Sequence, residues 1–586
     1  MSDRLPPPLP ISPPEARARG WPELDVVLVS GDAYVDHPSF GAALIGRVLE
    51  AAGFRVGIIA QPDWRRLDDF QRLGRPRLFF GITAGNMDSL VNHFTAQKRR
   101  RRQDAYSPGG APGCRPDRAT IVYANRAAQA YPGVPIVLGG VEASLRRISH
   151  YDFWDDAVRR SLLLDAMADL LVYGMGEQAV VEVARRLAAG EPVRALRDLP
   201  GTAYRCAAGQ EPAGVPWLPD HGSAAADPAQ FILMHRLAAE QARGSGQVLA
   251  QRAGDWSLVV LPPAPPLTGP ELDASYALPF SRRAHPAYRE PVPALEAVQF
   301  SLTSHRGCLG GCAFCALYAH QGRVVQSRSA AGLVAEAREL VAHPDFRGVI
   351  GDVGGPTANC YRARCRQGRD RRGCPRPSCL YPSLCPHLQR GQLHQLALLR
   401  RIAALEGVKR VLVASGVRHD LALADPDYVR ELAQHYVGGH LKLAPEHFSD
   451  QVLALMRKPG SGCYLECERE FRKRSQEVGK EQYVVPYLMA GHPGCRRQDM
   501  AAAAAFMRRH GIRVEQVQCF TPTPMTDATC MWHTGRDPWT GKRVYVPRDP
   551  RERAAQMALL QEAGSGPVRR RPQGPPTSER RDDARS

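Results

Sequence analysis

The sequence predicts an α/β protein in which a doubly wound parallel sheet is followed by a partial or full (β/α) barrel. Short apolar segments alternate with helical segments over residues 24–173, a pattern typical of a parallel sheet with helices on both faces. The alternation begins again at residue 297, and the first strand of this second part leads into a loop with three cysteines. We therefore expect two folded units, with the cysteines at the mouth of the second.

Changes in composition divide the chain into five parts. Prolines are frequent in residues 1–14 and again in residues 262–266, and residues 259–266 are predicted to form an extended, proline-fixed connector. We expect a disordered arm at residues 1–20, a doubly wound α/β domain at 21–205, a helical segment and proline-rich linker at 206–294, a barrel at 295–550 with a cysteine-rich insertion at 358–388, and a helix with a disordered basic tail at 551–586.

The first domain opens with a buried strand at residues 24–30. A turn follows, and then an apolar-periodic helix at 42–52 that ends at Gly53, where a left-handed residue is favoured. Further strands are predicted at 56–60, 78–82, 135–138 and 169–173. Ligands of doubly wound sheets bind at the carboxyl ends of the strands, so the glycine-containing loops after these strands are candidate binding segments.

The second domain shows the same strand and helix pattern around the cysteines. Val298, Phe300 and Leu302 alternate on one face of a strand, and a helical stripe follows the cysteine loop at residues 333–341. Because barrel active sites lie at the carboxyl ends of the strands, the cysteines should lie at that mouth. Later strands are predicted at 348–353, 411–416, 439–443, 483–487 and 514–518.

Three cysteines, Cys308, Cys312 and Cys315, have the spacing CxxxCxxC. A [4Fe-4S] cluster normally takes four thiolates, so a loop that offers three leaves one iron open to an exogenous ligand such as S-adenosylmethionine (SAM). A structural zinc site is the alternative, but zinc prefers four protein ligands. Three glycines in the same loop favour a backbone that wraps around a large group. We therefore predict an iron–sulfur cluster that uses SAM.

The segment at residues 308–323, CLGGCAFCALYAHQGR, resembles the radical SAM superfamily and, within it, the YgiQ family. The resemblance runs from about residue 24 to about residue 538 and includes GDAYVDHPSFG, GGPTAN and LKLAPEH. It implies a [4Fe-4S] cluster on Cys308, Cys312 and Cys315, bound SAM, and an electron donor of the flavodoxin or ferredoxin type. The radical made from SAM would abstract hydrogen from a substrate that the resemblance does not identify.

The resemblance also implies where SAM binds. In the superfamily a glycine-rich segment after the second strand contacts the methionine end of SAM, and polar groups at the ends of the middle strands hold its ribose and carboxylate. The aromatic ring beside the last cysteine would lie along the adenine. Salt bridges within loops are the alternative role for the polar residues. The cofactor-binding candidates are Phe314, Gly354, Gly355, Ser415, Arg418, Lys442 and Glu446.

The first domain resembles the cobalamin-binding domain that precedes many radical SAM barrels. Domains of that kind that ligate cobalt through histidine use the motif DxHxxG. The nearest segment here starts at Asp36 and His37, DHPSFG, and its spacing is different. We therefore do not expect cobalamin, and we assign His37 to a loop or to the substrate side.

A second group of cysteines lies in the basic insertion at residues 358–388. Cys365, Cys374, Cys379 and Cys385 are predicted to bind one metal centre, either zinc or an auxiliary iron–sulfur cluster, whereas Cys360 follows directly on the GGPTAN segment and is expected to be dispensable. The physical reason is that so polar a loop has little apolar surface to bury, so a metal would be needed to fold it.

Charge and cysteine usage limit the cellular setting. The net charge of +18 leaves nucleic acid open as a partner, although arginine runs such as residues 98–102 are usually solvated loops. No apolar run approaches the ~18 residues needed to cross a bilayer, and the N-terminus has no apolar signal core. We therefore expect a cytoplasmic protein without a membrane partner, whose 15 cysteines stay reduced.

Two functions from different classes remain. The first is a radical SAM enzyme that reductively cleaves SAM to a 5′-deoxyadenosyl radical and abstracts hydrogen from an unknown substrate. The alternative is a non-catalytic, metal-bearing RNA-binding protein. Formation of 5′-deoxyadenosine by the reduced protein distinguishes the two.

Overall fold

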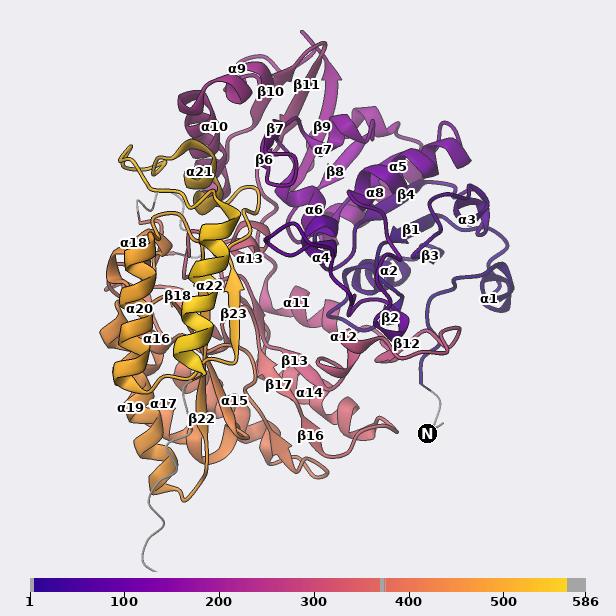
Figure 1. Ribbon diagram of the computed structural model, residues 1–586. Helices are drawn as coiled ribbons and strands as arrows, with labels where there is room; N and C mark the ends of the chain where they lie inside the picture. Colours follow the sequence, from indigo (N-terminus) through magenta and orange to yellow (C-terminus); the bar gives the residue numbers. More distant parts are fainter. Residues whose placement is uncertain (1–4, 369–373, 375, 566–586) are drawn as a thin grey trace, which may run out of the picture.

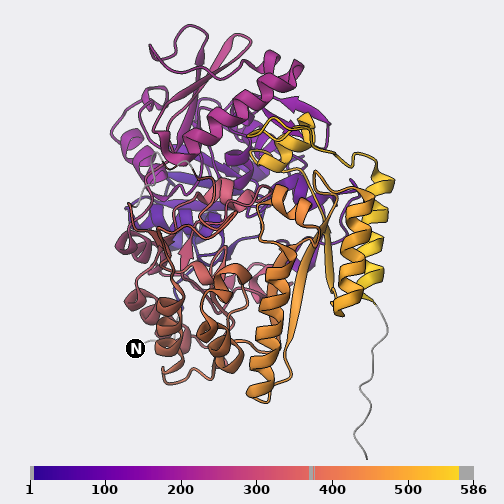
Figure 2. The same ribbon diagram turned by 90° about the vertical axis from the view of Figure 1, so that its left-hand side faces the viewer.

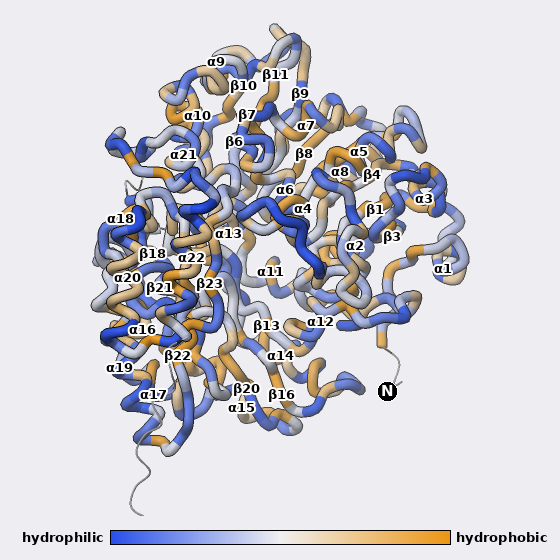
Figure 3. The backbone as a smooth tube through the Cα atoms, viewed as in Figure 1, coloured by the Kyte–Doolittle hydropathy of each residue, from blue (hydrophilic) through white to orange (hydrophobic). Residues whose placement is uncertain are grey.

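The computed structural model of the protein describes residues 5–368, 374 and 376–565. The chain forms two α/β halves that lie side by side, the first coloured indigo to magenta and the second pink to yellow (Figures 1 and 2). Hydrophobic residues follow the strands and hydrophilic residues follow the outer loops (Figure 3). No helix in the described part of the chain is both long enough and apolar enough to cross a bilayer.

The first half is built on an eight-stranded sheet with the order β10-β11-β9-β8-β5-β4-β1-β3. Five neighbouring strands are parallel, and the remaining three continue the sheet in antiparallel pairs. The parallel strands are β3 (Val56–Ala60), β1 (Val26–Ser30), β4 (Phe79–Thr83), β5 (Ile136–Leu138) and β8 (Leu170–Val172), and the antiparallel strands are β9 (Thr202–Ala207), β11 (Trp256–Val260) and β10 (Leu249–Ala253).

Helices cover both faces of this sheet, which confirms the doubly wound prediction. In β1, Val27 and Val29 belong to one hydrophobic core, and Val26 and Leu28 belong to the other. This split follows from the alternation of side chains along a strand. Helix α5 (Ala119–Ala130) packs on the first face, and α2 (Gly41–Ala51) and α8 (Glu177–Ala188) pack on the second.

The second half contains the expected series of parallel strands, as a partial barrel. Strands β13 and β17, then β16 and β20, then β21, β22 and β23 form parallel ladders, and a bridge from Val417 to Leu443 joins the middle of the series. No ladder of the described residues joins the last strand to the first. The strands are β13 (Ser301–Thr303), β16 (Val349–Ile350), β17 (Asp352–Gly354), β20 (Arg410–Val411), β21 (His440–Glu446), β22 (Tyr483–Ala490) and β23 (Gln516–Cys519).

Helices alternate with these strands and complete both halves. In the second half they are α13 (Ala316–Gln321), α14 (Ala330–Ala342), α15 (Gln392–Ala403), α16 (His419–Leu423), α17 (Pro426–Glu431), α18 (Asp450–Met456), α19 (Ser461–Glu477), α20 (Arg497–His510), α21 (Asp527–Thr534) and α22 (Pro550–Gly564). Between the halves lie α6 (Gly140–Leu145), α10 (Pro228–Glu240), α11 (Gly269–Tyr276) and the short strands β2 (Val35–Asp36), β12 (Arg283–Ala284), β14 (His305–Arg306) and β15 (Gln326–Ser327).

The expected domain boundaries need two corrections. Residues 249–260, expected to belong to a helical segment and linker, form β10 and β11, because the paired valines Val259 and Val260 extend the sheet before the prolines begin. Residues 5–20, expected to be disordered, are packed: Leu9 is buried, and the carbonyl of Pro10 accepts a hydrogen bond from Ile58 N. Residues 1–4 and the tail from residue 566 lie outside the described residues.

A buried ion pair fixes the start of the first domain to the interdomain segment. Arg47 donates to both carboxylate oxygens of Asp36, at 3.1 and 2.6 Å, and both side chains are at most 2% exposed. Asp36 also accepts a hydrogen bond from the backbone of Ser281, next to β12, which pairs with β2. The pair therefore contributes to the placement of one half against the other.

Replacement of Asp36 by Asn is expected to lower the free energy of unfolding by about 3 kcal/mol, because it leaves the Arg47 charge buried with only the more exposed Glu50 beside it. Urea unfolding followed by tryptophan fluorescence measures this effect. Asp63→Asn is the matched control, since its pair with Arg65 is exposed and should cost less than about 1 kcal/mol. Equal losses in the two variants would contradict the assignment.

Candidate functional site

The cysteine loop between β14 and α13 is wrapped as tightly as the sequence predicted. Gly307 has a φ of 77°, and a Cβ atom there would lie 2.0 Å from the carbonyl oxygen of Val324. Gly311 has a φ of 61°, and its Cβ would lie 2.7 Å from the carbonyl oxygen of Pro377. Only glycine combines this backbone with this close approach, so the two glycines set the course of the loop.

Hydrogen-bond donors surround the thiols of the loop. The amide of Gly310 donates to Cys308 Sγ at 3.3 Å, and the hydroxyl of Thr357 lies 3.3 Å from the same sulfur. Arg418 Nη1 lies 3.5 Å from Cys312 Sγ. Donors of this kind stabilise thiolate charge, which is the form of cysteine that binds metal.

The thiols differ in their proton affinity. The hydrogen bond from Cys360 lowers the pKa of Cys308 to about 6, with help from Thr357 and Gly310 and against the effect of burial. Burial raises the pKa of Cys315 to about 12. Cys360, which the sequence predicted to be dispensable, therefore lies in direct contact with a thiol of the loop.

The donor set fits a [4Fe-4S] cluster with one open iron. Three thiols from one loop, two enforced glycines and a guanidinium beside a sulfur are the chemistry that such a cluster needs. In the described part of the chain, no three His, Cys, Asp or Glu side chains lie close enough together to hold a single metal ion. A cubane binds each thiolate through a different iron, so its ligands need not converge on one point.

The GGPTAN segment supplies contacts through residues that the sequence analysis did not select. The hydroxyl of Thr357 contacts the sulfur of Cys308. The side chain of Asn359 forms two hydrogen bonds with the backbone of Arg418: its amide donates to the Arg418 carbonyl at 2.9 Å, and its oxygen accepts from the Arg418 N–H at 2.9 Å. Asp420 holds the guanidinium of Arg418 with both oxygens. Burial alone would raise the pKa of Asp420, but Arg418 lowers it to about 2.

Gly354 and Gly355, predicted to give SAM room, have a packing role in the structure. A Cβ atom on Gly354 would collide with the side chain of Ser415, and one on Gly355 would lie 2.7 Å from the carbonyl oxygen and ring of His305. Ser415 itself is held by Asp352, which accepts from its backbone N–H at 3.0 Å. The sequence located these residues at the mouth of the barrel, and their contact with SAM stays a prediction.

The remaining candidates lie on β21 and in the cysteine loop. Glu446 has a φ of 73°, its carboxylate lies 3.9 Å from Lys458 Nζ, and burial raises its pKa. Lys442 is half-buried on the same strand. Phe314 is half-buried, with its ring 6.1 Å from that of His492 in an edge contact. Arg418 is the candidate that the structure brings into contact with a cluster cysteine.

The cysteine-rich insertion packs on the cysteine loop. Its small hydrophobic core consists of Leu309 from the loop together with Cys360, Ala363, Cys379, Leu380, Cys385, Leu388 and Leu421. The amide of Cys379 donates to the carbonyl of Leu309, and the hydroxyl of Ser378 donates to that of Gly310. The premise that this loop has too little apolar surface to fold by burial was therefore wrong, and the second metal centre at Cys365, Cys374, Cys379 and Cys385 stays a prediction.

His37 belongs to the interdomain packing. It is fully buried; its Nδ1 accepts a hydrogen bond from the backbone of Ser39 at 3.0 Å, and its Nε2 lies 3.1 Å from Arg282 Nη1. Both ring nitrogens are thus occupied. The loop assignment made from the sequence agrees with this arrangement, and the prediction against cobalamin stays untested.

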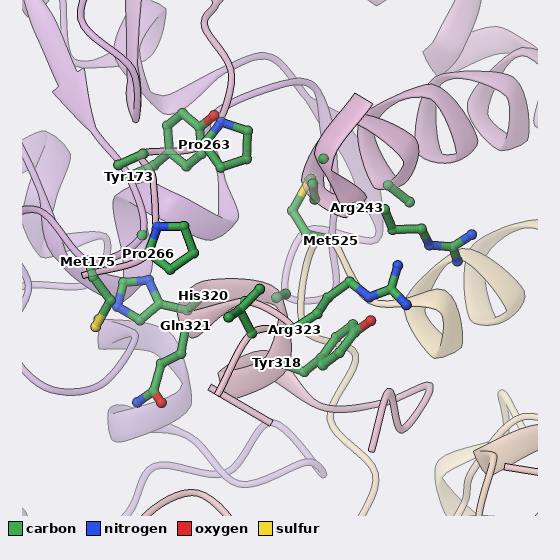
Figure 4. A pocket seen from close by; sticks show the side chains of 18 of the residues that line it. Tyr173, Met175, Arg243, Pro263, Pro266, Tyr318, His320, Gln321, Arg323 and Met525 are labelled. Carbon is green, nitrogen blue, oxygen red and sulfur yellow. The ribbon is translucent and has the colours of Figure 1, made fainter. Parts of the chain in front are cut away.

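A cavity of about 460 Å³ opens between the two halves, directly beside the cysteine loop (Figure 4). Cys312, Cys315 and Tyr318 line it on the side of the barrel, and Tyr173 and the segment 262–266 line it on the side of the first domain. Its volume is within the range of small-molecule sites. The sequence analysis missed the cavity, because its walls come from segments that no local pattern connects.

Comparison with known proteins defines the class. Residues 8–301 match the family model "Radical SAM N-terminal", residues 302–507 match "Radical SAM superfamily", and residues 515–565 match a domain of unknown function, DUF3362. Together with the thiol loop at the barrel mouth, these matches make the protein an enzyme of the radical SAM superfamily, and radical SAM chemistry implies a [4Fe-4S] cluster and SAM.

The chain belongs to the UPF0313 family. It is 53% identical to UPF0313 protein GSU2873 of Geobacter sulfurreducens over 554 residues, which cover 94% of this chain and 92% of that protein. It is 43% identical to UPF0313 protein YgiQ of Escherichia coli K12 over 617 residues, with 94% and 83% covered. The YgiQ resemblance is thereby confirmed.

Solved structures show a more distant similarity. TsrM from Kitasatospora setae, a radical SAM methyltransferase with cobalamin and a [4Fe-4S] cluster bound, matches with a TM-score of 0.48 and 16% identity over 86% of this chain and 78% of that chain. OxsB, a cobalamin-dependent radical enzyme, matches with a TM-score of 0.46 and 10% identity over 83% of this chain and 52% of that chain.

Replacement of Gly355 by Val is expected to displace His305, lower the free energy of unfolding by about 2 kcal/mol and reduce the iron content after reconstitution, since the cysteine loop starts two residues after His305. Gly351→Val is the matched control, because a Cβ at Gly351 meets nothing within 4 Å. Iron analysis and thermal unfolding of both variants measure the effect. If the two variants bind iron equally and are equally stable, the packing role of Gly355 is wrong.

Proposed function

We propose that the protein binds a [4Fe-4S] cluster through Cys308, Cys312 and Cys315, cleaves SAM reductively and abstracts hydrogen from a substrate in the adjacent cavity. The observation that carries this proposal is the cysteine loop itself. It places three half-buried cysteines at the mouth of the partial barrel, next to hydrogen-bond donors. Two of these cysteines, Cys312 and Cys315, line a cavity large enough for a small molecule. When bound, cluster and SAM supply a 5′-deoxyadenosyl radical.

We propose that Arg418 stabilises the negative charge of the thiolates at this site. Its guanidinium lies beside Cys312 Sγ, Asp420 fixes the guanidinium, and Asn359 fixes its backbone. A rigid positive charge next to thiolates stabilises the negative charge that reduction adds. The positioning by Asp420 and Asn359 means that this charge is in place before any ligand binds.

For SAM we propose two kinds of contribution. Phe314, Arg418, Lys442 and Glu446 contact the cofactor, whereas Gly354, Gly355 and Ser415 act by packing the ends of β13, β17 and the segment after β20. The proposal is supported by the placement of Glu446 at the end of β21, where its carboxyl group lies 3.9 Å from Lys458 Nζ. Paired charges of this kind suit the amino and carboxylate groups of an amino acid.

The enzyme needs a reductant and a substrate. We propose an electron donor of the flavodoxin or ferredoxin type and a cytoplasmic location, in which the cysteines stay reduced. The alternative function, a metal-bearing RNA-binding protein, uses the same thiols but does not cleave SAM. A family match to radical SAM enzymes favours the first function.

We expect that replacing any one of Cys308, Cys312 and Cys315 by alanine abolishes both the visible absorbance of the reconstituted cluster and the formation of 5′-deoxyadenosine. The two remaining thiolates cannot hold the cluster. The measurement uses anaerobic protein, dithionite and SAM. Cys114→Ala, a half-buried cysteine outside the site, serves as the control and should keep both signals. SAM cleavage by any of the three variants would refute the cluster assignment, and no cleavage by the unmodified chain would favour the RNA-binding alternative.

A further inference from the structure

The cavity beside the cysteine loop contains a concentration of positive charge. Arg243, Arg323 and Arg457 line it together with Tyr318, and we call these three arginines the arginine cluster. In Figure 4 the side chains of Arg243 and Arg323 lie next to each other, with the hydroxyl of Tyr318 turned toward them. Burial raises the pKa of Tyr318, while all three guanidiniums act to lower it, which agrees with their closeness to the hydroxyl.

Arg323 is buried, and no carboxylate of the described residues forms an ion pair with it. The residue is 6% exposed, and its Nη2 donates to the carbonyl of Arg376 at 2.6 Å. Its Nε and Nη1 have no hydrogen-bond partner, although both are inaccessible to solvent. Burial of an uncompensated guanidinium is costly, and the described structure leaves two donors of Arg323 without a partner next to the cavity that this residue lines.

Asp527, the one carboxylate among the described residues of the cavity wall, already has partners. Asp527 binds Arg457 with one oxygen, which also accepts from Trp539 Nε1 at 3.0 Å, and its other oxygen lies 2.5 Å from His235 Nε2. Burial would raise the pKa of Asp527, but Arg457 and His235 keep it well below its usual range. Asp527 is therefore ionised and compensates Arg457, and among the described residues neither Arg243 nor Arg323 forms an ion pair with it.

Arg243 is also without a carboxylate partner among the described residues. Its guanidinium stacks on the ring of Trp539 at 4.0 Å, a contact that leaves its N–H groups free at the ring edge. Burial lowers the pKa of Arg243, the charges of Tyr318 and Asp527 oppose this effect, and the charges of Arg323 and Arg457 add to it. Three guanidiniums with one carboxylate leave an excess of positive charge in this wall, and a bound anion would reduce their mutual repulsion.

We propose that the arginine cluster binds the phosphate or carboxylate group of a small organic anion, and that this anion is the substrate of the enzyme. The inference rests on the proposed function. Guanidinium forks match both groups in a bidentate way. The anionic group lies between Arg243 and Arg323, and the remainder of the molecule extends past His320 toward Tyr173, over the cysteine loop.

Calorimetry on the anaerobically reconstituted holoenzyme tests this proposal. Inorganic phosphate and pyrophosphate probe the phosphate source, succinate and glutarate probe the carboxylate source, and a uridine decamer probes nucleic acid. Arg323→Gln and Arg243→Gln are each expected to weaken the binding of the preferred small anion at least 10-fold, and Arg323→Lys, which keeps the charge but loses the fork, should weaken it less. Arg338→Gln, on the exposed face of α14, is the matched control and should bind as the unmodified chain does.

Three outcomes would overturn the proposal: no small anion binds the unmodified chain, the glutamine variants bind as tightly as that chain, or the decamer alone binds and loses affinity in the same variants. Iron content and thermal unfolding show whether each variant is folded, and Arg323→Lys covers the case in which Arg323→Gln is not. The test is independent of turnover. Protein that binds the anion but does not cleave SAM refutes the proposed function and keeps the anion site, whereas protein that cleaves SAM but binds no probe refutes the anion site alone.

Discussion

The backbone of the cysteine loop has little regular structure of its own, so its polar groups must find partners elsewhere. Four segments provide them: Gly322 accepts from Cys308 N, Cys379 N donates to Leu309, Met456 accepts from Ala313 N, and Ala528 N donates to Ala313. The insertion, α18 and the start of α21 thus meet at one loop. This requirement explains why a polar insertion and a C-terminal segment, neither part of the barrel ladders, fold against the mouth of the barrel.

A buried ion pair connects the first domain to the start of the same loop. Arg306, one residue before the loop, forms a buried ion pair with Glu177 at the start of α8. Because breaking such a pair leaves an uncompensated charge, the relative position of the two halves is tightly specified. The cavity between them is therefore a property of the docked halves, and neither half alone encloses it.

The sequence was sufficient where a signal is local. The alternation of strands and helices predicted the doubly wound sheet and the parallel strands of the barrel, and the CxxxCxxC spacing with its glycines predicted the wrapped loop. It was insufficient where a partner is distant. Val259 and Val260 looked like a connector because their partners on β9, Tyr204 and Ala203, lie more than 50 residues earlier in the chain. Leu9 packs against strands that come later in the chain. The roles of Thr357 and Asn359 follow from their contacts with Cys308 and Arg418, which lie about 50 to 60 residues away in the sequence. The GGPTAN motif was recognised, but the contacts of its polar end with Cys308 and Arg418 were not predicted, and the contact of its glycines with SAM stays a prediction.

Most of the residues that hydrogen-bond to the backbone of the cysteine loop come later in the chain than the loop itself, and this order affects how the loop folds during synthesis. Cys308, Cys312 and Cys315 leave the ribosome long before Met456 and Ala528, the residues that hold Ala313 in place. During synthesis the three thiols are therefore joined only by a glycine-rich segment that has not yet been fixed. It follows that the cysteine loop reaches its folded backbone only after the chain has been synthesised through α21 and these later segments have folded back onto it.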